Sequence, residues 1–190
     1  MPRRSYHTSS RREPPFSLVL DPSSLVPCGD KPEEEKVAIR RAGELISETN
    51  VAIYLSRRML KVYRTRVIPL LREHHPLPPL QAGLTRTIDY LWRTRLCRPI
   101  RRKIGGAQLH ILERTRVERY DVRGLGLEDE EDMEVLRVAL AIGHDTLLVT
   151  IDRHFLEGLR WRELRARYPT ESNRLEIIKP SELIKRLAPS

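Results

Sequence analysis

Short apolar runs alternate with helical patterns along most of this chain, and this alternation constrains the fold more than any other feature of the sequence. Three runs have the length and apolar content of buried strands: FSLVL at 16–20, NVAIYLS at 50–56 and DTLLVT at 145–150. Three segments have apolar residues at helical spacing: 33–48, 57–73 and 127–143. Strands that alternate with helices predict an α/β fold, here a three-layer α/β/α sandwich around a central, mostly parallel sheet.

The chain divides into a basic arm, residues 1–15, and one domain, residues 16–190. The arm is polar, contains four arginines and ends in two prolines, a composition typical of segments without a core of their own. Inside the domain, residues 79–104 predict a basic helical segment that ends before Pro99.

Three other parts of the domain have their own signals. Ser56 is a suitable N-cap for the helix that follows it. Residues 107–124 are ambiguous, with helical spacing early and extended character later, and the glycine pair before them allows a bend. LEIIKPSELIKRL at 175–187 predicts a short strand, a proline and a final helix.

The composition narrows the function classes. With 35 Lys and Arg against 26 Asp and Glu, the formal net charge is +9, which favours a polyanionic partner such as nucleic acid. A salt-bridged, thermophile-type surface is the alternative. Two cysteines and six scattered histidines exclude a disulfide framework and a four-ligand zinc site. No apolar run approaches the roughly 20 residues of a membrane span, and the start lacks an apolar centre, so we expect a cytoplasmic protein with no membrane partner.

Three aspartates occupy positions that an α/β fold would bring together. Asp21 directly follows the FSLVL run. Asp152 lies two residues beyond Thr150, the last residue of the DTLLVT run. Asp132 opens a helix and shares a face with Leu136 and Ala139, which predicts that it points inward. Ligands of open parallel sheets bind at the carboxyl ends of the strands. The sequence therefore predicts an acidic pocket at that edge.

Carboxylates that converge in one pocket repel each other unless a cation neutralises them. Mg²⁺ or Mn²⁺ fits oxygen ligands of this kind and supports phosphodiester hydrolysis. Each residue also has a structural interpretation: Asp21 in a turn, Asp132 at the positive end of a helix dipole, and Asp152 as an N-cap.

The order of these motifs resembles the PIN-domain superfamily, and within it the prokaryotic toxin nucleases of toxin–antitoxin pairs. The resemblance runs from about Phe16 to Leu187 and rests on VLDPSSLV, LSRRMLKVYRTRVI, DMEVLRVALAIGHDTLLVTIDRHFL and IIKPSELI. Its most specific block is D-x-x-h-h-x-x-A, a strand and T-x-D-x-x-F, represented by Asp132, Val135, Leu136, Ala139, Thr150, Asp152 and Phe155.

The resemblance implies a metal-dependent ribonuclease that uses Mg²⁺ or Mn²⁺. Asp21, Asp132 and Asp152 match the family's catalytic and metal-binding aspartates. Ser23 and Thr150 match the hydroxyl positions that support them, and Asp129 is a further candidate metal ligand.

The chain departs from the family at one position. Val62 stands where, in the family, the helix after the second strand usually carries a glutamate. Nearby acids could compensate for it, with Asp129 or Glu128 best placed and Glu44 or Glu48 as further candidates.

Two groups of cations are candidates for RNA binding. The acid-free segment WRTRLCRPIRRK supplies Arg93, Arg95, Arg98, Arg101, Arg102 and Lys103, and the helix after Ser56 supplies Arg57, Arg58, Lys61 and Arg64. Tyr90 and Trp92 could stack on bases, although packing into the core is the favoured interpretation of Trp92.

Two functions follow as hypotheses. The first is a metal-dependent endoribonuclease, with an antitoxin protein as partner and a homodimer as a further expected state. The second is a catalytically weakened PIN-domain protein that binds RNA or a ribonucleoprotein, such as the ribosome, without cutting. A phosphoaspartyl hydrolase built on Asp21 is disfavoured, because Ser23 stands where that chemistry expects a second aspartate.

Overall fold

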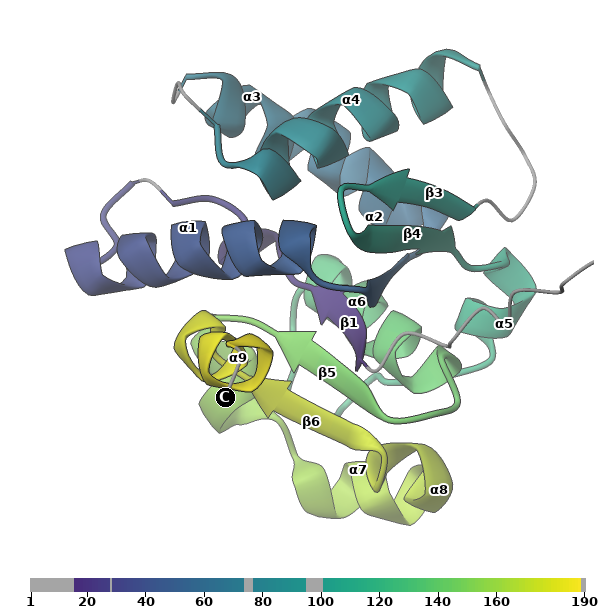
Figure 1. Cartoon of the computed structure of the whole chain (residues 1–190). Helices are drawn as coiled ribbons and strands as arrows, with labels where there is room; N and C mark the ends of the chain where they lie inside the picture. The colour runs from purple at the N-terminus through teal and green to yellow at the C-terminus, as the bar shows by residue number, and fades with distance from the viewer. Residues whose placement is uncertain (1–15, 28, 74–76, 95–100, 189–190) are drawn as a thin grey trace, which may run out of the picture.

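A six-stranded sheet with the order β3-β4-β2-β1-β5-β6 forms the centre of the described chain (Figure 1). This computed structural model describes residues 16–27, 29–73, 77–94 and 101–188, so the expected arm at 1–15 lies outside the described residues. The strands are β1 (Phe16–Leu20), β2 (Val51–Leu55), β3 (Arg101–Ile104), β4 (Ala107–Ile111), β5 (Thr146–Val149) and β6 (Leu175–Ile178). All neighbours pair in parallel except β3 and β4, so the predicted mostly parallel sheet is confirmed.

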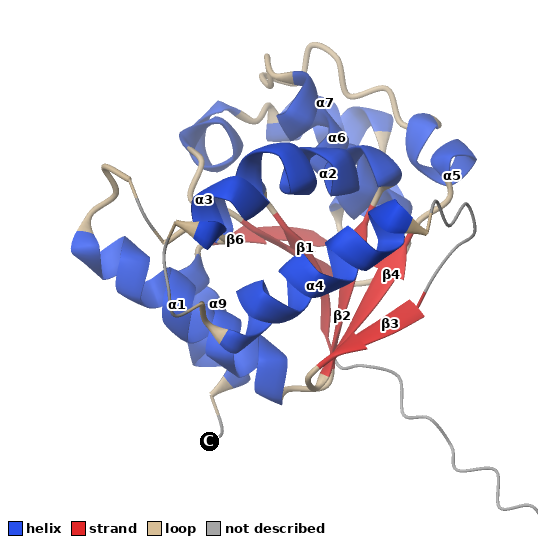
Figure 2. Cartoon of the chain, turned by 90° about the horizontal axis from the view of Figure 1, so that it is seen from above, coloured by secondary structure: helices blue, strands red, loops and turns tan. Residues whose placement is uncertain are grey.

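Helices cover both faces of the sheet, as expected for a three-layer α/β/α sandwich (Figure 2). On one side, α1 (Glu33–Glu48) contacts α4 (Pro79–Arg93) and α9 (Pro180–Leu187). On the other side, α6 (Glu130–Ala141) packs on β1, β2 and β5 and contacts α5 (Arg114–Glu118). The remaining helices are the 3-10 turn η1 (Pro22–Ser24), α2 (Arg57–Val62), the π-helical η2 (Tyr63–Val67) and η3 (His154–Gly158), α3 (Ile68–Arg72), α7 (Trp161–Arg167) and α8 (Pro169–Ser172).

The central strands form where the sequence is continuously apolar. Leu18, Val19 and Leu20 of β1 are each at most 1% exposed, because helices cover both faces of a parallel sheet. The predicted helix at 33–48 is confirmed with the same bounds. The N-cap prediction is also confirmed, since the Ser56 hydroxyl accepts a hydrogen bond of 3.1 Å from the Met59 N–H.

Two predictions in the middle of the chain need correction. The helix expected at the start of segment 79–104 is confirmed as α4, which ends at Arg93 and so before Pro99, but the last four residues of the segment form the edge strand β3, which was not predicted. In 107–124 the order is the reverse of the expected one, because the strand β4 comes first and the short helix α5 follows. Alternate residues of β4 are buried, which is the period of a strand, and Gly105 takes a φ of +60° in the turn from β3.

None of the helices in the described residues is long and apolar enough to cross a bilayer. The terminal prediction is confirmed, since β6 and α9 are the strand and helix expected in 175–187.

Candidate metal centre

Two neighbouring strands bring distant residues to the carboxyl edge of the sheet. Leu20, the last residue of β1, pairs with Val149, the last residue of β5. The Asp21 N–H then donates a hydrogen bond of 3.0 Å to the Val149 carbonyl. As a result, the segments that follow the two strands lie side by side, and Asp21 meets the stretch that contains Asp152.

Asp21 is buried, at 3% exposed, and two hydroxyl residues hold its carboxylate. Its Oδ2 accepts hydrogen bonds from the Ser23 N–H at 3.1 Å, from the Ser23 hydroxyl, and from Thr150 Oγ1 at 3.0 Å. The same Thr150 oxygen accepts from the Asp152 N–H at 2.9 Å. The supporting roles predicted for Ser23 and Thr150 therefore have a geometric basis, and one hydroxyl links two of the predicted aspartates.

The surroundings of Asp21 make its carboxyl harder to ionise than a carboxyl in water. Burial raises the pKa of Asp21 to about 7, and the nearby charge of Asp132 contributes in the same direction. The hydrogen bonds from Ser23 and Thr150 stabilise the carboxylate and oppose the increase. A buried acid with this pKa is typical of functional sites, although structural networks also produce such shifts.

Asp132 lies in the first turn of α6 and is buried, as its shared face with Leu136 and Ala139 predicted. Burial raises its pKa to about 6, and the charge of Asp152 adds to the increase. His154 opposes it, with Nδ1 at 3.4 Å from Asp132 Oδ2. The same Nδ1 lies 3.5 Å from Asp152 Oδ1, so the imidazole stands between two carboxylates.

Asp132, Asp152 and His154 form a group that could hold a metal ion. One ligand atom from each lies within 4.8 Å of the others. Two carboxylates and one imidazole are a donor set that fits a divalent cation, which would also neutralise the repulsion between the acids.

Asp21 and Asp129 lie beside this group without belonging to it. Asp21 is near enough for its charge to interact with Asp132, but it is not one of the three residues within 4.8 Å. Asp129 accepts a hydrogen bond of 2.7 Å from the Glu131 N–H as the N-cap of α6, and its charge also raises the pKa of Asp132.

His154 was not among the predicted site residues. The spacing of the histidines gives no signal for it, because His154 joins one acid from helix α6, Asp132, and one from its own loop, Asp152. The signal that could have identified it is its position two residues after Asp152 in the turn beyond a buried strand. There its N–H donates a hydrogen bond of 2.8 Å to Asp152 Oδ1.

The segment around Val62, α2 and η2, contains no carboxylate that could take the place of the expected glutamate. Val62 is half-buried, and the next residue, Tyr63, is buried and donates a hydrogen bond from its hydroxyl to the Leu20 carbonyl. Burial and the charge of Asp21 raise the Tyr63 pKa well above its usual value, so the hydroxyl stays a neutral donor.

The distant acids considered as compensation do not reach the site. Glu48 ends α1 shortly before β2 begins, at the amino edge of the sheet, and Glu44 lies one helical turn further back, paired with Arg41 at 2.8 Å. The idea that these two residues compensate is therefore wrong. Glu128 is exposed in the loop before α6.

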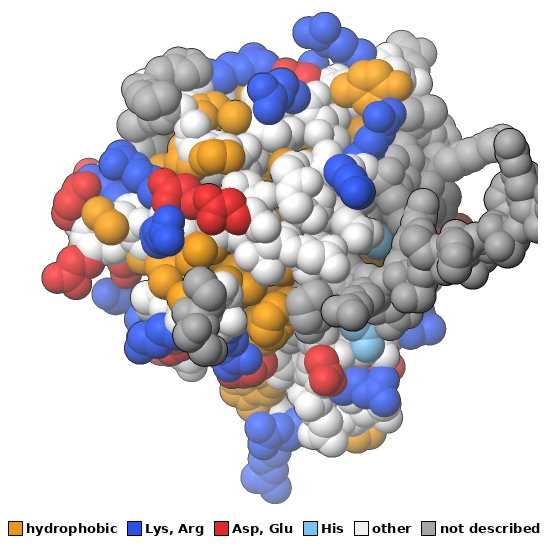
Figure 3. All heavy atoms as spheres, viewed as in Figure 1, with side chains coloured by type: hydrophobic (Ala, Val, Ile, Leu, Met, Phe, Trp, Pro, Cys, Tyr) orange, Lys and Arg blue, Asp and Glu red, His pale blue; other side chains and the backbone are white. Residues whose placement is uncertain are grey.

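Only some of the predicted RNA-binding cations lie close to one another. Arg57, Arg58 and Lys61 are exposed on α2 and line one cavity. Arg93, Arg102 and Lys103 are exposed around α4 and β3, whereas Arg95 and Arg98 lie outside the described residues and Arg101 is described only as part of the β3 backbone. On the face drawn in Figure 3, cationic and acidic side chains are intermixed and form no continuous basic surface.

The exposed aromatic residues sit beside arginines. Trp92 is 43% exposed, with the Arg64 guanidinium 4.5 Å from its ring centroid, so the favoured assignment of Trp92 to the core is wrong. Tyr90 is 47% exposed and has the same contact, at 4.5 Å, with Arg102. Both rings remain candidates for stacking.

No family model, curated protein or solved structure matches this chain.

Proposed function

We propose that this protein is a divalent-metal-dependent endoribonuclease of the PIN-domain type, which hydrolyses phosphodiester bonds in RNA. The observation that carries the proposal is the convergence of Asp132, Asp152 and His154 beside Asp21 at the carboxyl edge of the sheet. The three aspartates come from separate parts of the chain, and the mutual repulsion of their carboxylates would be relieved by a cation.

The residues that would hold the metal are Asp132, Asp152 and His154, with Asp21 adjacent. A bound divalent ion lowers the pKa of a coordinated water and offsets charge on a phosphate oxygen. Mn²⁺ suits this donor set better than Mg²⁺, because an imidazole is a softer ligand than a carboxylate or water.

The remaining groups position the site. Ser23 and Thr150 both donate hydrogen bonds to Oδ2 of Asp21, and Thr150 also orients the backbone that carries Asp152. Hydrogen bonds of this kind orient metal ligands in proteins, and their loss typically weakens binding or activity. RNA as the substrate is supported by the net charge of +9 and by the exposed cations on α2.

A cleavage assay with a charge-matched control tests the proposal. Labelled single-stranded RNA is incubated with the purified protein and Mn²⁺ or Mg²⁺, next to the double variant Asp21→Asn/Asp152→Asn. The control variant, Asp30→Asn/Asp145→Asn, removes two exposed acids outside the site. We expect cleavage by the wild type and by the control, and its loss in the site variant. Equal cleavage by all three proteins would reject the proposal.

A second function is favoured by one specific observation. The helix after β2 supplies Val62 and Tyr63 where the family usually supplies a carboxylate, which would leave the metal weakly held. The protein would then be a PIN-domain factor that binds RNA or a ribonucleoprotein without cutting it. RNA binding without cleavage in the same assay, at millimolar Mn²⁺, would select this function. An antitoxin partner, a homodimer and a ribosomal location remain predictions of the family resemblance.

A further inference from the structure

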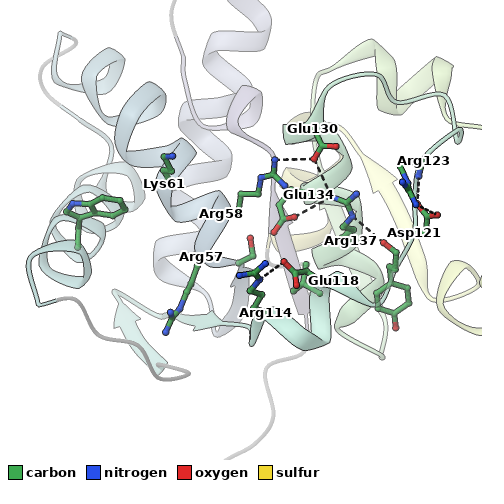
Figure 4. A pocket seen from close by; sticks show the side chains of 14 residues that line it. Arg57, Arg58, Lys61, Arg114, Glu118, Asp121, Arg123, Glu130, Glu134 and Arg137 are labelled. Atoms are coloured by element: carbon green, nitrogen blue, oxygen red, sulfur yellow. Dashed lines mark hydrogen bonds and ion pairs between the residues drawn. The ribbon is translucent and has the colours of Figure 1, made fainter.

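A cavity of about 780 Å³ lies between α2, α5 and α6 (Figure 4), at the same edge of the sheet as the candidate metal centre. Ser56, which follows β2 at the carboxyl edge of the sheet, lines it. Glu130 also lines it and stands two residues before Asp132 in the first turn of α6. The cavity and the metal centre therefore share one edge of the sheet and one helical turn.

The cavity carries a net positive charge. Six basic and four acidic side chains line it. The acids are paired: Glu130 lies 3.1 Å from Arg58, Glu134 lies 3.6 Å from Arg137, and the other two pair with Arg114 and Arg123. Two positive charges are left over.

The unpaired cations in this cavity are Arg57 and Lys61 of α2. Neither forms an ion pair with any of the described residues, and Figure 4 draws both without the dashed contacts that join their neighbours. They are one helical turn apart, so they occupy the same face of the helix. Both are exposed and have no acidic partner in the cavity, so they are available to a group that carries negative charge.

An aromatic ring lines the same cavity. Trp92 is 43% exposed and lines the cavity together with Arg57 and Lys61. The Arg64 guanidinium, 4.5 Å from the ring centroid, adds a further cation at this side. An indole beside unpaired cations is the combination that binds unpaired nucleotides, because the base stacks while the cations contact the phosphate.

We propose that this cavity binds one nucleotide of a single-stranded RNA, with its phosphate at Arg57 and Lys61 and its base on Trp92. The identity of the ligand as RNA rests on the proposed function, whereas the site itself rests on the cavity. Because the cavity adjoins the first turn of α6, the bound nucleotide would lie close to the phosphodiester that reaches the metal centre. It would thereby select unpaired over paired RNA.

Tryptophan fluorescence measures this binding without cleavage. The chain has two tryptophans, so a Trp161→Phe background reports on Trp92 alone. A short oligouridylate is titrated in EDTA at several salt concentrations. We expect saturable quenching, and we expect Arg57→Ala/Lys61→Ala to reduce the steepness of log affinity against log salt by about 0.7, the value for one lost phosphate contact on a single strand.

The control is Arg162→Ala/Lys185→Ala, which removes two exposed charges on α7 and α9. An unchanged slope in the control supports the proposal. An equal change in both double variants, or equal quenching of Trp92 by a blunt RNA duplex, would overturn it.

The assay separates the two proposals. Quenching that depends on Arg57 and Lys61, in a protein that cuts no RNA with Mn²⁺, keeps the cavity site and rejects the nuclease. Cleavage that is unaffected when these two residues are replaced, with no quenching of Trp92, keeps the nuclease and rejects the cavity site.

Discussion

Thr150 donates a hydrogen bond of 3.0 Å from Oγ1 to Asp21 Oδ2, although the two residues are 129 positions apart in the chain. The pairing of β1 with β5 brings them together, and the Asp152 N–H donates to the same threonine oxygen at 2.9 Å. The hydroxyl thus fixes both sides of the acidic pocket. Valine has nearly the same shape as threonine but no hydroxyl, so the substitution Thr150→Val separates the role of the hydroxyl from that of packing.

Thr150→Val should weaken the site more than the fold. The substitution keeps the volume of the side chain, so we expect a loss of about 1 to 2 kcal/mol in unfolding free energy from the missing hydrogen bonds. Metal affinity and cleavage should fall by about 10- to 100-fold, the usual effect of removing a group that orients a ligand. Calorimetric titration with Mn²⁺ measures the affinity. A variant that binds Mn²⁺ as the wild type does would contradict the positioning role.

Asp21→Asn should stabilise the metal-free protein at high pH. The folded-state pKa of Asp21 is raised to about 7 from an ordinary value of 3.8. The folded protein therefore holds the proton more tightly than the unfolded chain, so this contribution is fully present below pH 4 and is lost as the pH rises through 7. The amide has no proton to lose. The difference in unfolding free energy between the variant and the wild type should therefore grow by about 2 to 3 kcal/mol as the pH rises from 5 to 8.

Urea unfolding in EDTA at several pH values measures this difference. Asp145→Asn is the matched control, because Asp145 is exposed. A gap between Asp21→Asn and the wild type that stays constant from pH 5 to pH 8 would show that Asp21 is not held neutral by its surroundings.

Mn²⁺ affinity of the wild type should rise steeply from pH 5 to pH 8. The pKa of Asp132 is raised to about 6 and that of the adjacent Asp21 to about 7. At low pH, protons therefore compete with the ion for Asp132 and remove the nearby negative charge of Asp21. Calorimetry in buffers with different ionisation enthalpies counts the protons released on binding. We expect about one to two protons at pH 6, and no release would contradict the coupling.

His154→Ala should reduce Mn²⁺ affinity by about tenfold or more and affect Mg²⁺ less, because an imidazole contributes little to a magnesium site. The backbone hydrogen bond from residue 154 to Asp152 remains in the variant. His144→Ala is the control, since His144 lies at the opposite edge of the sheet and contacts Ser17 at 2.6 Å. Equal losses for the two metals would indicate that His154 is not a ligand.

The strands and helices that sequence patterns predicted are those with a continuous local signal. β1 is uninterrupted by polar residues apart from Ser17, and α1 repeats its apolar positions through sixteen residues. β3 has no such signal: its residues are three cations and one isoleucine, and it is a strand because β4 supplies an antiparallel partner. Tertiary pairing overrides local pattern in such cases.

The sequence predicted the site only to the extent that the positions of strand ends and the period of a helix determine which residues meet there. Parallel neighbours bring Asp21 and Asp152 to one edge whatever their side chains do, and the period of α6 turns Asp132 inward. The place of His154 between the acids depends on the conformation of a loop, and the displacement of Asp21 from the three-residue group depends on side-chain orientation. Neither follows from spacing along the chain.

One backbone contact underlies the loop that carries His154. Gly126, with a φ of +90°, packs so closely on Gly158 that a Cβ at position 126 would lie 2.1 Å from the Gly158 carbonyl oxygen. Gly158 is the last residue of η3, which begins at His154. Gly126→Ala should therefore cost about 3 kcal/mol or more, from the left-handed backbone and the clash together.

Gly124→Ala separates these two causes. Gly124 has a φ of +75°, but the nearest atom to its added Cβ is an Arg167 guanidinium nitrogen at 3.8 Å, so this variant bears only the backbone cost of about 1 kcal/mol. Urea unfolding of both variants gives the clash by difference. If a shift of η3 instead relieves the clash in Gly126→Ala, the unfolding free energy of this variant will approach that of Gly124→Ala. The shift would then move His154, and Mn²⁺ affinity would fall in Gly126→Ala while Gly124→Ala keeps the wild-type value. Wild-type stability and wild-type Mn²⁺ affinity in Gly126→Ala would together contradict the close contact between the two glycines.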